Sequence, residues 1–271
     1  NVFDLVTMFT TTMAAYPYTE MKYKEGSAGF QTEGSAKSQA DFLMETRFAN
    51  PFTCAVWLPI TKQSLTDIPG LQSLATDFLV KMHNLKKSQQ LINGTASATE
   101  PGGVLTLATT ITLNAGLTAK VVSPNITDVI NGMATTMYLT HNHVGEMPTL
   151  ANVVFVNPAD FYVEFVAAKD GQGLPLYPTA SLMNRVTIGN MLVIPKEEIT
   201  AGTIVVCDMS KYWMSNYEGL TVEIGRINND FITNTLCILV ESRYHAFVKN
   251  LDLIGFKKGV IATLKTALLK P

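Results

Sequence analysis

Residues Gly219–Phe256 read GLTVEIGRINNDFITNTLCILVESRYHAFVKNLDLIGF, and this stretch is the most informative part of the chain. Strand-like apolar sequence stands on both sides of a turn at Asn228-Asn229-Asp230. The part before the turn ends a predicted pair of strands, Lys211–Tyr217 and Leu220–Arg226, and the part after it is a longer apolar strand. The C-terminal region is therefore predicted to be built mainly from β-strands.

A long helix is predicted upstream, over Pro69–Ile92. Thr66 and Asp67 can cap it, Pro69 suits its first turn, and Asn93-Gly94 ends it. A single stripe repeats every three or four residues and comprises Leu71, Leu74, Phe78, Met82, Leu85 and Gln89. At about 1.5 Å per residue the helix is roughly 36 Å long, which suits the spine of an elongated domain.

A long β-hairpin with a tip rich in glycine and serine is predicted over residues 18–50. Alternating polar and apolar residues break at Gly26, Gly29 and Gly34, and extended sequence resumes at Asp41–Arg47. Arms of about twelve residues project such a hairpin roughly 40 Å. A two-stranded hairpin alone in water is marginally stable, so a neighbouring subunit is expected to cover it.

The remaining elements mix helices and strands without strict βαβ alternation, which indicates an α+β fold. They are an extended or loosely helical arm (residues 1–17), strands at Phe52–Ile60, Asn152–Val156, Arg185–Val193 and Thr203–Asp208, and helices at Ile126–Thr140, with Asn125 or Thr127 near its cap, and at Pro158–Ala168.

The composition of the 271 residues is poor in charge, with 15% charged and 47% hydrophobic residues. Ordinary globular chains carry roughly 25% charged residues. Burial of surface in an oligomer and an unusually well-filled core both explain this, and composition does not separate them. The formal net charge of −2 disfavours a dedicated DNA reader, and the lysines of the tail, Lys257, Lys258, Lys265 and Lys270, are interpreted as a solvated terminus.

The sequence offers no convincing site for a metal, a cofactor or a soluble substrate. Cys54, Cys207 and Cys237 match no zinc or redox spacing and are expected to be buried free thiols. His141 and His143 lack a third ligand at a supporting spacing, so a solvated loop is favoured over a metal site. Common hydrolase, metalloprotease and phosphate-binding motifs are absent, and no apolar run is long enough to span a membrane.

Six stretches, in order along the chain, resemble tailed-phage major capsid proteins of the Hong Kong 97 fold. They are Trp57–Lys62 followed by Leu65–Leu71, Gln90–Gly94, Val154–Phe161, Lys169–Gly173, Ala201–Asp208 and Asp230–Asn234. The first resembles the family's entry to its spine helix, and Val154–Phe161 resembles its strand-to-helix turn at Asn157-Pro158. At Thr95-Ala96-Ser97 the chain departs from the family's second glycine-rich half.

The resemblance implies both an architecture and a function. Residues 1–17 would be the N-arm, 18–56 the extended loop, 57–120 with 235–271 the peripheral domain, and 121–234 the axial domain. The protein would self-assemble through pentamers and hexamers into an icosahedral shell that encloses double-stranded DNA without reading its sequence. Portal, maturation protease and decoration proteins would be its partners. The protein would be located in the virion, which is assembled in the host cytoplasm. Asn1 is consistent with proteolytic removal of a preceding scaffolding segment.

Some members of this family cross-link the subunits of their shells covalently through isopeptide bonds. By resemblance, Lys37 and Asn234 are the candidate cross-link residues and Glu241 the candidate base, the only catalysis expected of this chain. The carboxylate would take a proton while the amine attacks the amide. Seven residues along a strand span about 23 Å, so Glu241 could hardly serve Asn234 of its own chain.

Two alternative functions remain open at this stage. An encapsulin-like cellular nanocompartment shell would share the fold and enclose a protein cargo instead of DNA. A soluble α+β enzyme or binding module with an unrecognised site would instead need a ligand pocket and a stable monomer.

Overall fold

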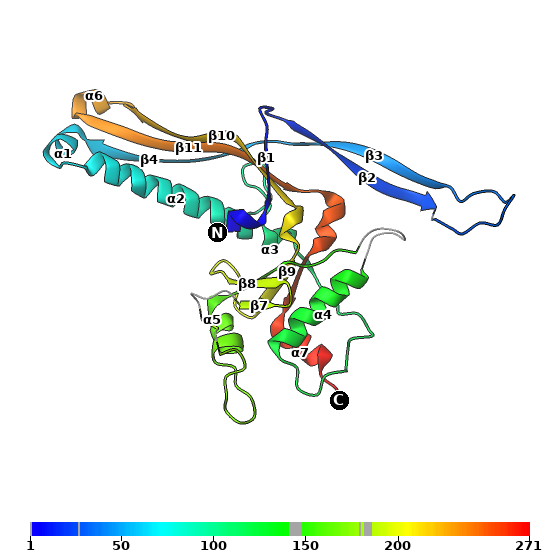
Figure 1. Cartoon of the computed structure of the whole chain (residues 1–271). Coiled ribbons are helices and arrows are strands. Elements are labelled where there is room, and N and C mark those ends of the chain that lie inside the picture. The colour runs from blue at the N-terminus through cyan, green and yellow to red at the C-terminus, as the bar shows by residue number, and fades with distance from the viewer. Residues whose placement is uncertain (1, 27, 141–147, 179, 182–185) are drawn as a thin grey trace. The chain divides into compact units, whose positions relative to one another are not determined.

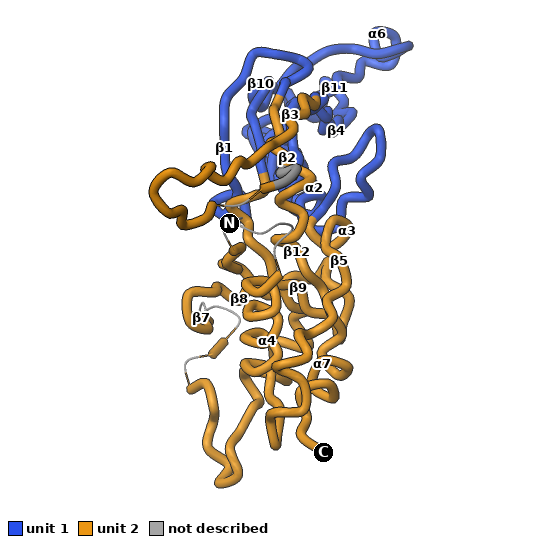
Figure 2. Tube along the Cα trace, turned by 90° about the vertical axis from the view of Figure 1, so that its right-hand side faces the viewer, with its two compact units in different colours: residues 1–17, 48–103, 213–247 blue, residues 18–47, 104–212, 248–271 orange. Residues whose placement is uncertain are grey.

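The computed structural model describes residues 2–26, 28–140, 148–178, 180–181 and 186–271. The predicted α+β class is confirmed, because helices and β-sheets both contribute to the described chain (Figure 1). Two compact units are present. Unit 1 comprises residues 1–17, 48–103 and 213–247, and unit 2 comprises residues 18–47, 104–212 and 248–271 (Figure 2).

Unit 1 is organised around a four-stranded sheet in the order β1-β10-β11-β4. Its strands are β1 (Thr7–Thr10), β4 (Phe52–Thr61), β10 (Tyr212–Gly225) and β11 (Thr235–Val248). β1 runs parallel to β10, and β11 runs antiparallel to β4 with Leu239 opposite Trp57. The sheet therefore joins the start of the chain to segments more than two hundred residues away.

The predicted strand pair Lys211–Tyr217 and Leu220–Arg226 is wrong, because β10 runs unbroken through both segments. Gly219, which lies between them, is not among the glycines with positive φ and lies within the strand, so no turn forms there. The turn at Asn228-Asn229-Asp230 is confirmed. Asn228 (φ 45°) and Asn234 (φ 57°) take the left-handed conformation that asparagine tolerates, on either side of the short helix α6 (Asp230–Thr233).

The predicted long helix is confirmed as α2 (Leu71–Asn93), but its predicted N-terminal cap residues are wrong. Thr66 and Asp67 belong to a separate short helix, α1 (Lys62–Asp67), which Thr61 caps. α2 instead begins after Gly70, which has a left-handed backbone (φ 82°) that glycine adopts without strain. As predicted, α2 ends at Asn93, with Gly94 as its C-cap.

The predicted apolar stripe of α2 does not face the protein's own core. Leu74, Phe78, Met82 and Leu85 are between 44% and 67% exposed. The buried face lies one residue further along, where Ala75 and Leu79 pack with Val240 and its strand neighbour Ile238, and where His83 is also buried. The helix thus covers the sheet with small and medium side chains and leaves its largest ones outside.

Unit 2 contains a six-stranded sheet in the order β5-β12-β9-β6-β8-β7. Its strands are β5 (Thr109–Thr110), β6 (Val153–Val156), β7 (Val186–Ile188), β8 (Met191–Pro195), β9 (Thr203–Cys207) and β12 (Phe256–Val260). The helices in this unit are α3 (Val104–Leu107), α4 (Ile126–Leu139), α5 (Pro158–Phe161) and α7 (Ile261–Leu268). Short 3-10 or π-helical segments complete the described elements at η1 (Val2–Leu5, unit 1), η2 (Tyr162–Val166), η3 (Met209–Lys211) and η4 (Asn250–Gly255).

A closed hydrophobic core holds unit 2 together. Buried residues of α4, α7, α5 and strands β6, β8 and β9 form one cluster, including Met133, Phe161 and Leu264. Asn125 caps α4 in a capping box with Asp128, as the sequence predicted for Asn125. The predicted helix Pro158–Ala168 is instead α5 followed by a π-helical turn, η2, and the predicted strand Arg185–Val193 is divided between β7 and β8.

The predicted hairpin is confirmed as the two-stranded sheet of β2 (Tyr16–Gly26) and β3 (Ala40–Ala49). Polar contacts anchor it at one end. The buried Glu20 carboxylate accepts a hydrogen bond from the Asn250 backbone N–H at 2.7 Å, and Arg47 Nε lies 3.6 Å from the same carboxylate. Further along, the hairpin exposes large apolar side chains, including Phe42 (52%) and Met44 (60%). None of the described helices combines the length and apolarity needed to cross a membrane.

Candidate assembly surface

The two faces of the unit 1 sheet carry different side chains. Successive residues of a strand point to opposite faces. Along β11, Ile238 and Val240 point toward α2, and Ser242 meets His83 of that helix at 2.9 Å. Cys237, Leu239 and Glu241 therefore lie on the opposite face, which α2 does not cover.

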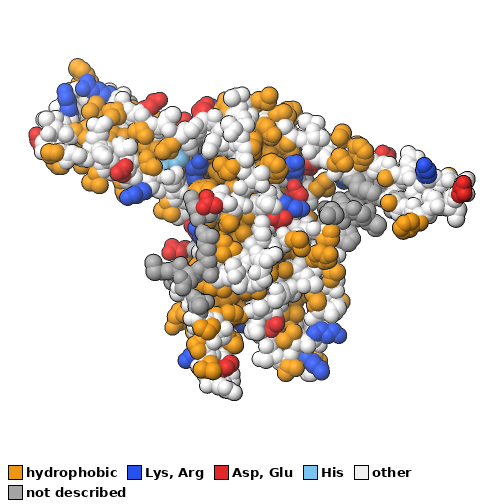
Figure 3. Space-filling model, in the orientation of Figure 1, with side chains coloured by type: hydrophobic (Ala, Val, Ile, Leu, Met, Phe, Trp, Pro, Cys, Tyr) orange, Lys and Arg blue, Asp and Glu red, His pale blue; other side chains and the backbone are white. Residues whose placement is uncertain are grey.

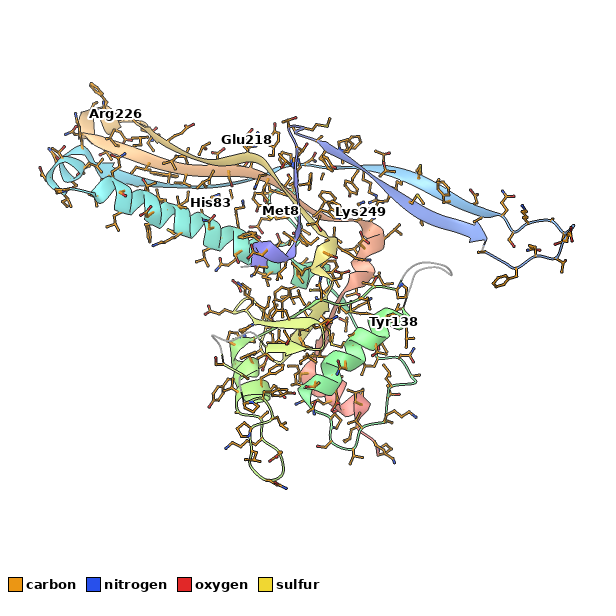
Figure 4. The ribbon with its side chains drawn as sticks, in the orientation of Figure 1. Met8, His83, Tyr138, Glu218, Arg226 and Lys249 are labelled. Atoms are coloured by element: carbon orange, nitrogen blue, oxygen red, sulfur yellow. The ribbon has the colours of Figure 1, made fainter. Side chains whose placement is uncertain are left out.

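An apolar pocket of about 310 Å³ opens on this uncovered face. Trp57 of β4, 53% exposed, forms one wall together with Leu239, its partner across the strand pair. The remaining lining residues are Cys237 and the end of β10 with the residues that follow it, Glu223, Ile224, Gly225, Arg226 and Ile227. Figure 4 labels Arg226 at this end of the sheet, next to α6. The sequence did not indicate this pocket, because the exposed register on which Trp57 falls in β4 is visible only in the structure.

A second apolar surface lies between α2 and the edge strand β4. It is an open groove of about 630 Å³ lined by Leu58, Pro59, Ile60, Thr61, Ser64, Ile68, Leu71, Leu74, Ala75 and Phe78, a set without a charged residue. In Figure 3, hydrophobic side chains are exposed over α2 and over the hairpin, with charged side chains scattered among them. Such surfaces are typical of protein–protein contact sites.

The three residues predicted for an isopeptide cross-link lie in three different places in the chain. Lys37 is exposed in the hairpin tip, between β2 and β3. Asn234 is the half-buried C-cap of α6, and its carbonyl accepts a hydrogen bond from Lys62 N–H at 2.9 Å. Glu241 lies midway along β11, opposite Ala55. At about 3.3 Å per residue, Asn234 and Glu241 of one chain are roughly 23 Å apart, so one chain does not bring them together.

Two histidines are buried inside unit 1, as expected for structural side chains. His83 contacts Ser242 Oγ, and its burial, together with the nearby Lys87 ammonium, lowers the pKa of its imidazole (Figure 4). His245 is fully buried between Ser215 Oγ at 2.7 Å and the Ala14 carbonyl at 3.0 Å. Because a carbonyl only accepts hydrogen bonds, His245 Nε2 is the donor to Ala14 and fixes the N-terminal arm on the sheet.

The three cysteines are free, as predicted, although Cys54 is only half-buried. Burial raises the pKa of the Cys54 and Cys207 thiols, which keeps them protonated and unreactive. Among the described residues, no group of three or more His, Cys, Asp or Glu side chains could hold a metal ion. His141 and His143 lie outside the described residues. The described part of the chain thus offers two exposed apolar surfaces suited to protein contacts.

The chain is similar to known proteins in both sequence and structure. A family profile described as "Phage capsid family" matches residues 1–250. The major capsid protein of Enterobacteria phage HK97 is 26% identical over 243 residues, which cover 89% of this chain and 60% of that protein. The chain therefore spans less than two thirds of the length of this curated relative.

Solved structures share the fold at low sequence identity. A structure from Gordonia phage Cozz matches with a TM-score of 0.69 at 14% identity, over 96% of this chain and 85% of that one. The structure titled "Capsid of native GTA particle computed with C5 symmetry" matches with a TM-score of 0.68 at 14% identity, over 96% and 89%. Mycobacterium phage Bobi provides a third, with a TM-score of 0.67 at 11% identity, over 96% and 89%. These matches confirm the fold predicted from the sequence.

Proposed function

The chain belongs to the phage capsid family, and we propose that it is a major capsid protein that assembles with copies of itself into an icosahedral shell around double-stranded DNA. The observation that carries the proposal is the large apolar surface that the described chain leaves uncovered on unit 1 and on the hairpin. Exposed patches of this kind need a partner, and copies of the same chain supply one.

The four-part architecture expected from the sequence belongs to this proposal. Residues 1–17 act as the N-arm, 18–56 as the extended loop that lies over a neighbour, 57–120 with 235–271 as the peripheral domain, and 121–234 as the axial domain of pentamers and hexamers. The grouping of α2, β4 and β11 in one compact unit, and of α4 and β6 to β9 in the other, agrees with the centres of the two proposed domains. The outer bounds differ, because residues 18–47, 104–120 and 248–271 group with unit 2 and residues 213–234 group with unit 1. Portal, maturation protease and decoration proteins are the expected partners in the virion.

The encapsidated DNA is held without sequence-specific contacts in this proposal. The formal net charge of −2 provides no strong overall positive field to condense on a phosphate backbone. The closed shell would thus retain the DNA by enclosing it, and contacts between the protein surface and the DNA would contribute little binding energy.

Electron microscopy and gel filtration of the purified chain test the proposal. Closed particles of uniform diameter, eluting in the void volume, are the expected result. A stable species of about 30 kDa that never assembles would contradict it. Particles filled with a single protein cargo and lacking nucleic acid would instead identify the nanocompartment alternative.

A covalent cross-link between subunits is the finer part of the proposal. Lys37 Nζ, as the neutral amine, attacks Asn234 Cγ of a neighbouring copy. The new C–N bond replaces the bond to Nδ2, which leaves as ammonia. Glu241 takes the proton from the attacking nitrogen and returns it to the leaving group. The span of about 23 Å between Asn234 and Glu241 along one chain supports a reaction centre shared between copies.

Boiling purified particles in SDS with reductant tests the cross-link. A ladder of covalent oligomers that disappears in Lys37→Arg supports it, and Lys22→Arg, on the same hairpin, serves as the matched control that keeps the ladder. A single band near 30 kDa from the unmodified particles would show that no cross-link forms.

A further inference from the structure

We infer that the pocket beside Trp57 receives Phe30 from the hairpin tip of a second copy of the chain. This inference rests on the proposed function and deepens it by naming the contact that joins one subunit to the next. Its basis is a concave apolar site on one unit and a projecting aromatic side chain on another part of the same sequence.

The pocket suits one large apolar side chain. Its volume of about 310 Å³ is at the lower end of the roughly 300–1,000 Å³ typical of small-molecule sites. Its walls include Trp57, Leu239 and Ile224, while Glu223 and Arg226 are its two charged lining residues. An aromatic anchor in a pocket of this type is the usual centre of a protein–protein interface.

Phe30 has the properties of such an anchor. It is 110% exposed relative to a reference side chain, the highest value among the exposed large hydrophobic residues of the described chain. The tip that presents it is ordered by polar contacts. Gln31 Nε2 donates to Ser38 Oγ at 2.8 Å, and Ser35 Oγ donates to the Thr32 carbonyl at 2.7 Å. These contacts fold the polar residues of the tip onto each other and leave Phe30 facing outward.

Charge is complementary between the tip and the pocket. The tip carries Glu33 and Lys37, both exposed, on the two sides of its turn. The pocket carries Arg226 and Glu223. One seated orientation can therefore match each charge with an opposite one, which selects a register without adding a buried unpaired charge.

The chain connectivity favours a second copy over the same chain. Within the described residues, β3 pairs with β2 and β4 pairs with β11, and β3 and β4 belong to different sheets. Only residues 50–51 separate β3 from β4, so a hairpin folded back onto Trp57 of its own chain would place β3 against β4 as a paired strand. That pairing is absent from the described sheets.

The thiol of Cys237 provides a direct experimental test, because it lines the pocket and hydrogen-bonds to Asp230 Oδ2 at 3.3 Å. Phe30→Cys is introduced alone, assembled particles are treated with a mild thiol oxidant, and gel lanes with and without reductant separate the disulfide from any isopeptide ladder. The two thiols then lose two electrons and two protons to the oxidant and form a disulfide. Expected are reductant-sensitive dimers and higher oligomers in most copies, lost in Cys237→Ser. The control Phe42→Cys, on β3, should give at least tenfold less.

Each outcome decides the inference. Intact particles without intermolecular disulfides, or a link confined to single chains, would overturn it while leaving the proposed function standing. If Phe30→Cys prevents assembly, the same test is made on particles formed with a tenfold excess of the unmodified chain, because the neighbouring copies still supply Cys237. Failure of the unmodified chain to form particles would overturn the proposed function, and the inference with it.

Fluorescence gives an independent readout. In a Trp213→Phe chain, Trp57 is the only tryptophan. Its emission should shift to shorter wavelength on assembly, since Phe30 covers an indole that is 53% exposed in the single chain. Phe30→Ala should abolish the shift and Phe30→Leu should keep most of it. An equal shift in the Phe30→Ala particles would contradict the inference.

Discussion

The core of unit 2 buries its apolar side chains, whereas unit 1 and the β2–β3 hairpin leave many of theirs exposed. In unit 2, α4, α5 and α7 enclose a continuous cluster with strands β6, β8 and β9, including the fully buried Met133 and Phe161. In unit 1, α2 meets the sheet through a small cluster of Ala75, Leu79, Ile238 and Val240. Larger side chains of the same helix and of the hairpin, such as Phe78 and Phe42, stay exposed. The unit 2 core buries its apolar side chains within its own chain. The exposed apolar side chains of α2 and the hairpin would be buried only by contact with other chains.

Removing the hairpin should have the largest effect, because it should abolish assembly and leave the unit 2 core folded. Replacing residues 20–48 with a short Gly-Ser linker should leave the unit 2 core and its cooperative unfolding intact, because that core does not use these residues. Assembly should be lost completely, since the hairpin is the element proposed to contact a neighbouring copy. Negative-stain microscopy together with circular dichroism measures both effects. Normal particles from the deletion variant would refute the account.

The same substitution in the two regions should give opposite results. Phe165→Ala, at a side chain 1% exposed in the unit 2 core, should lower the free energy of unfolding by about 3–5 kcal/mol. Phe78→Ala, at a side chain 54% exposed on α2, should change the stability of the unassembled chain by less than about 0.5 kcal/mol and should weaken assembly instead. Urea denaturation and light scattering measure the two quantities. Equal losses of unfolding free energy in Phe165→Ala and Phe78→Ala would contradict the proposed difference between the two regions.

The α2–sheet contact should be sensitive to acid through His83. Burial lowers the pKa of this imidazole below its ordinary value of 6.5, so the unfolded chain binds the proton more readily than the folded one. Stability from this group is therefore complete above pH 6.5 and is lost as the pH falls toward the lowered folded pKa, with a slope of at most about 1.4 kcal/mol per pH unit. Urea midpoints of the unassembled chain between pH 7.5 and 5.5 measure it. His83→Gln should flatten the profile, and an unchanged profile would exclude His83 as the cause.

The smallest expected difference concerns two ion pairs. In unit 2, Lys265 Nζ contacts both Glu164 oxygens at 2.6 and 2.7 Å, with the two side chains 29% and 21% exposed. In unit 1, Arg243 meets Glu218 at 2.8 Å, with side chains 32% and 48% exposed. Glu164→Gln should cost about 1 kcal/mol and Glu218→Gln close to nothing, because solvent screens the more exposed pair. Thermal unfolding in low and high salt compares them, and the reverse order would contradict this ranking.

Local patterns predicted much of the fold. The strand predicted at Phe52–Ile60 is β4, the glycines located the hairpin tip, and Asn125 marked the start of α4. The errors have physical causes. Thr66 and Asp67 are reasonable cap residues, but the chain uses them in α1 and begins α2 with a left-handed Gly70. Gly219 resembles a turn residue, yet β10 passes straight through it.

The candidate site was harder to predict than the fold. The stripe at Leu74, Phe78, Met82 and Leu85 is a genuine helical periodicity, but periodicity does not say which molecule covers it. Trp57 falls on the exposed register of an otherwise half-buried strand, which becomes meaningful only once the pocket beside it is known. The predicted contributions of Lys37, Asn234 and Glu241 depend on neighbouring copies, so they remain predictions.

Hydroxyl-radical footprinting of assembled particles and of dissociated subunits tests the central claim most directly. If other copies complete unit 1 and the hairpin, oxidation of Phe30, Trp57 and Phe78 should fall several-fold on assembly. Phe161, already buried in the unit 2 core, should remain unlabelled in both states. Equal oxidation of the three exposed residues in particles and in free subunits would contradict the account.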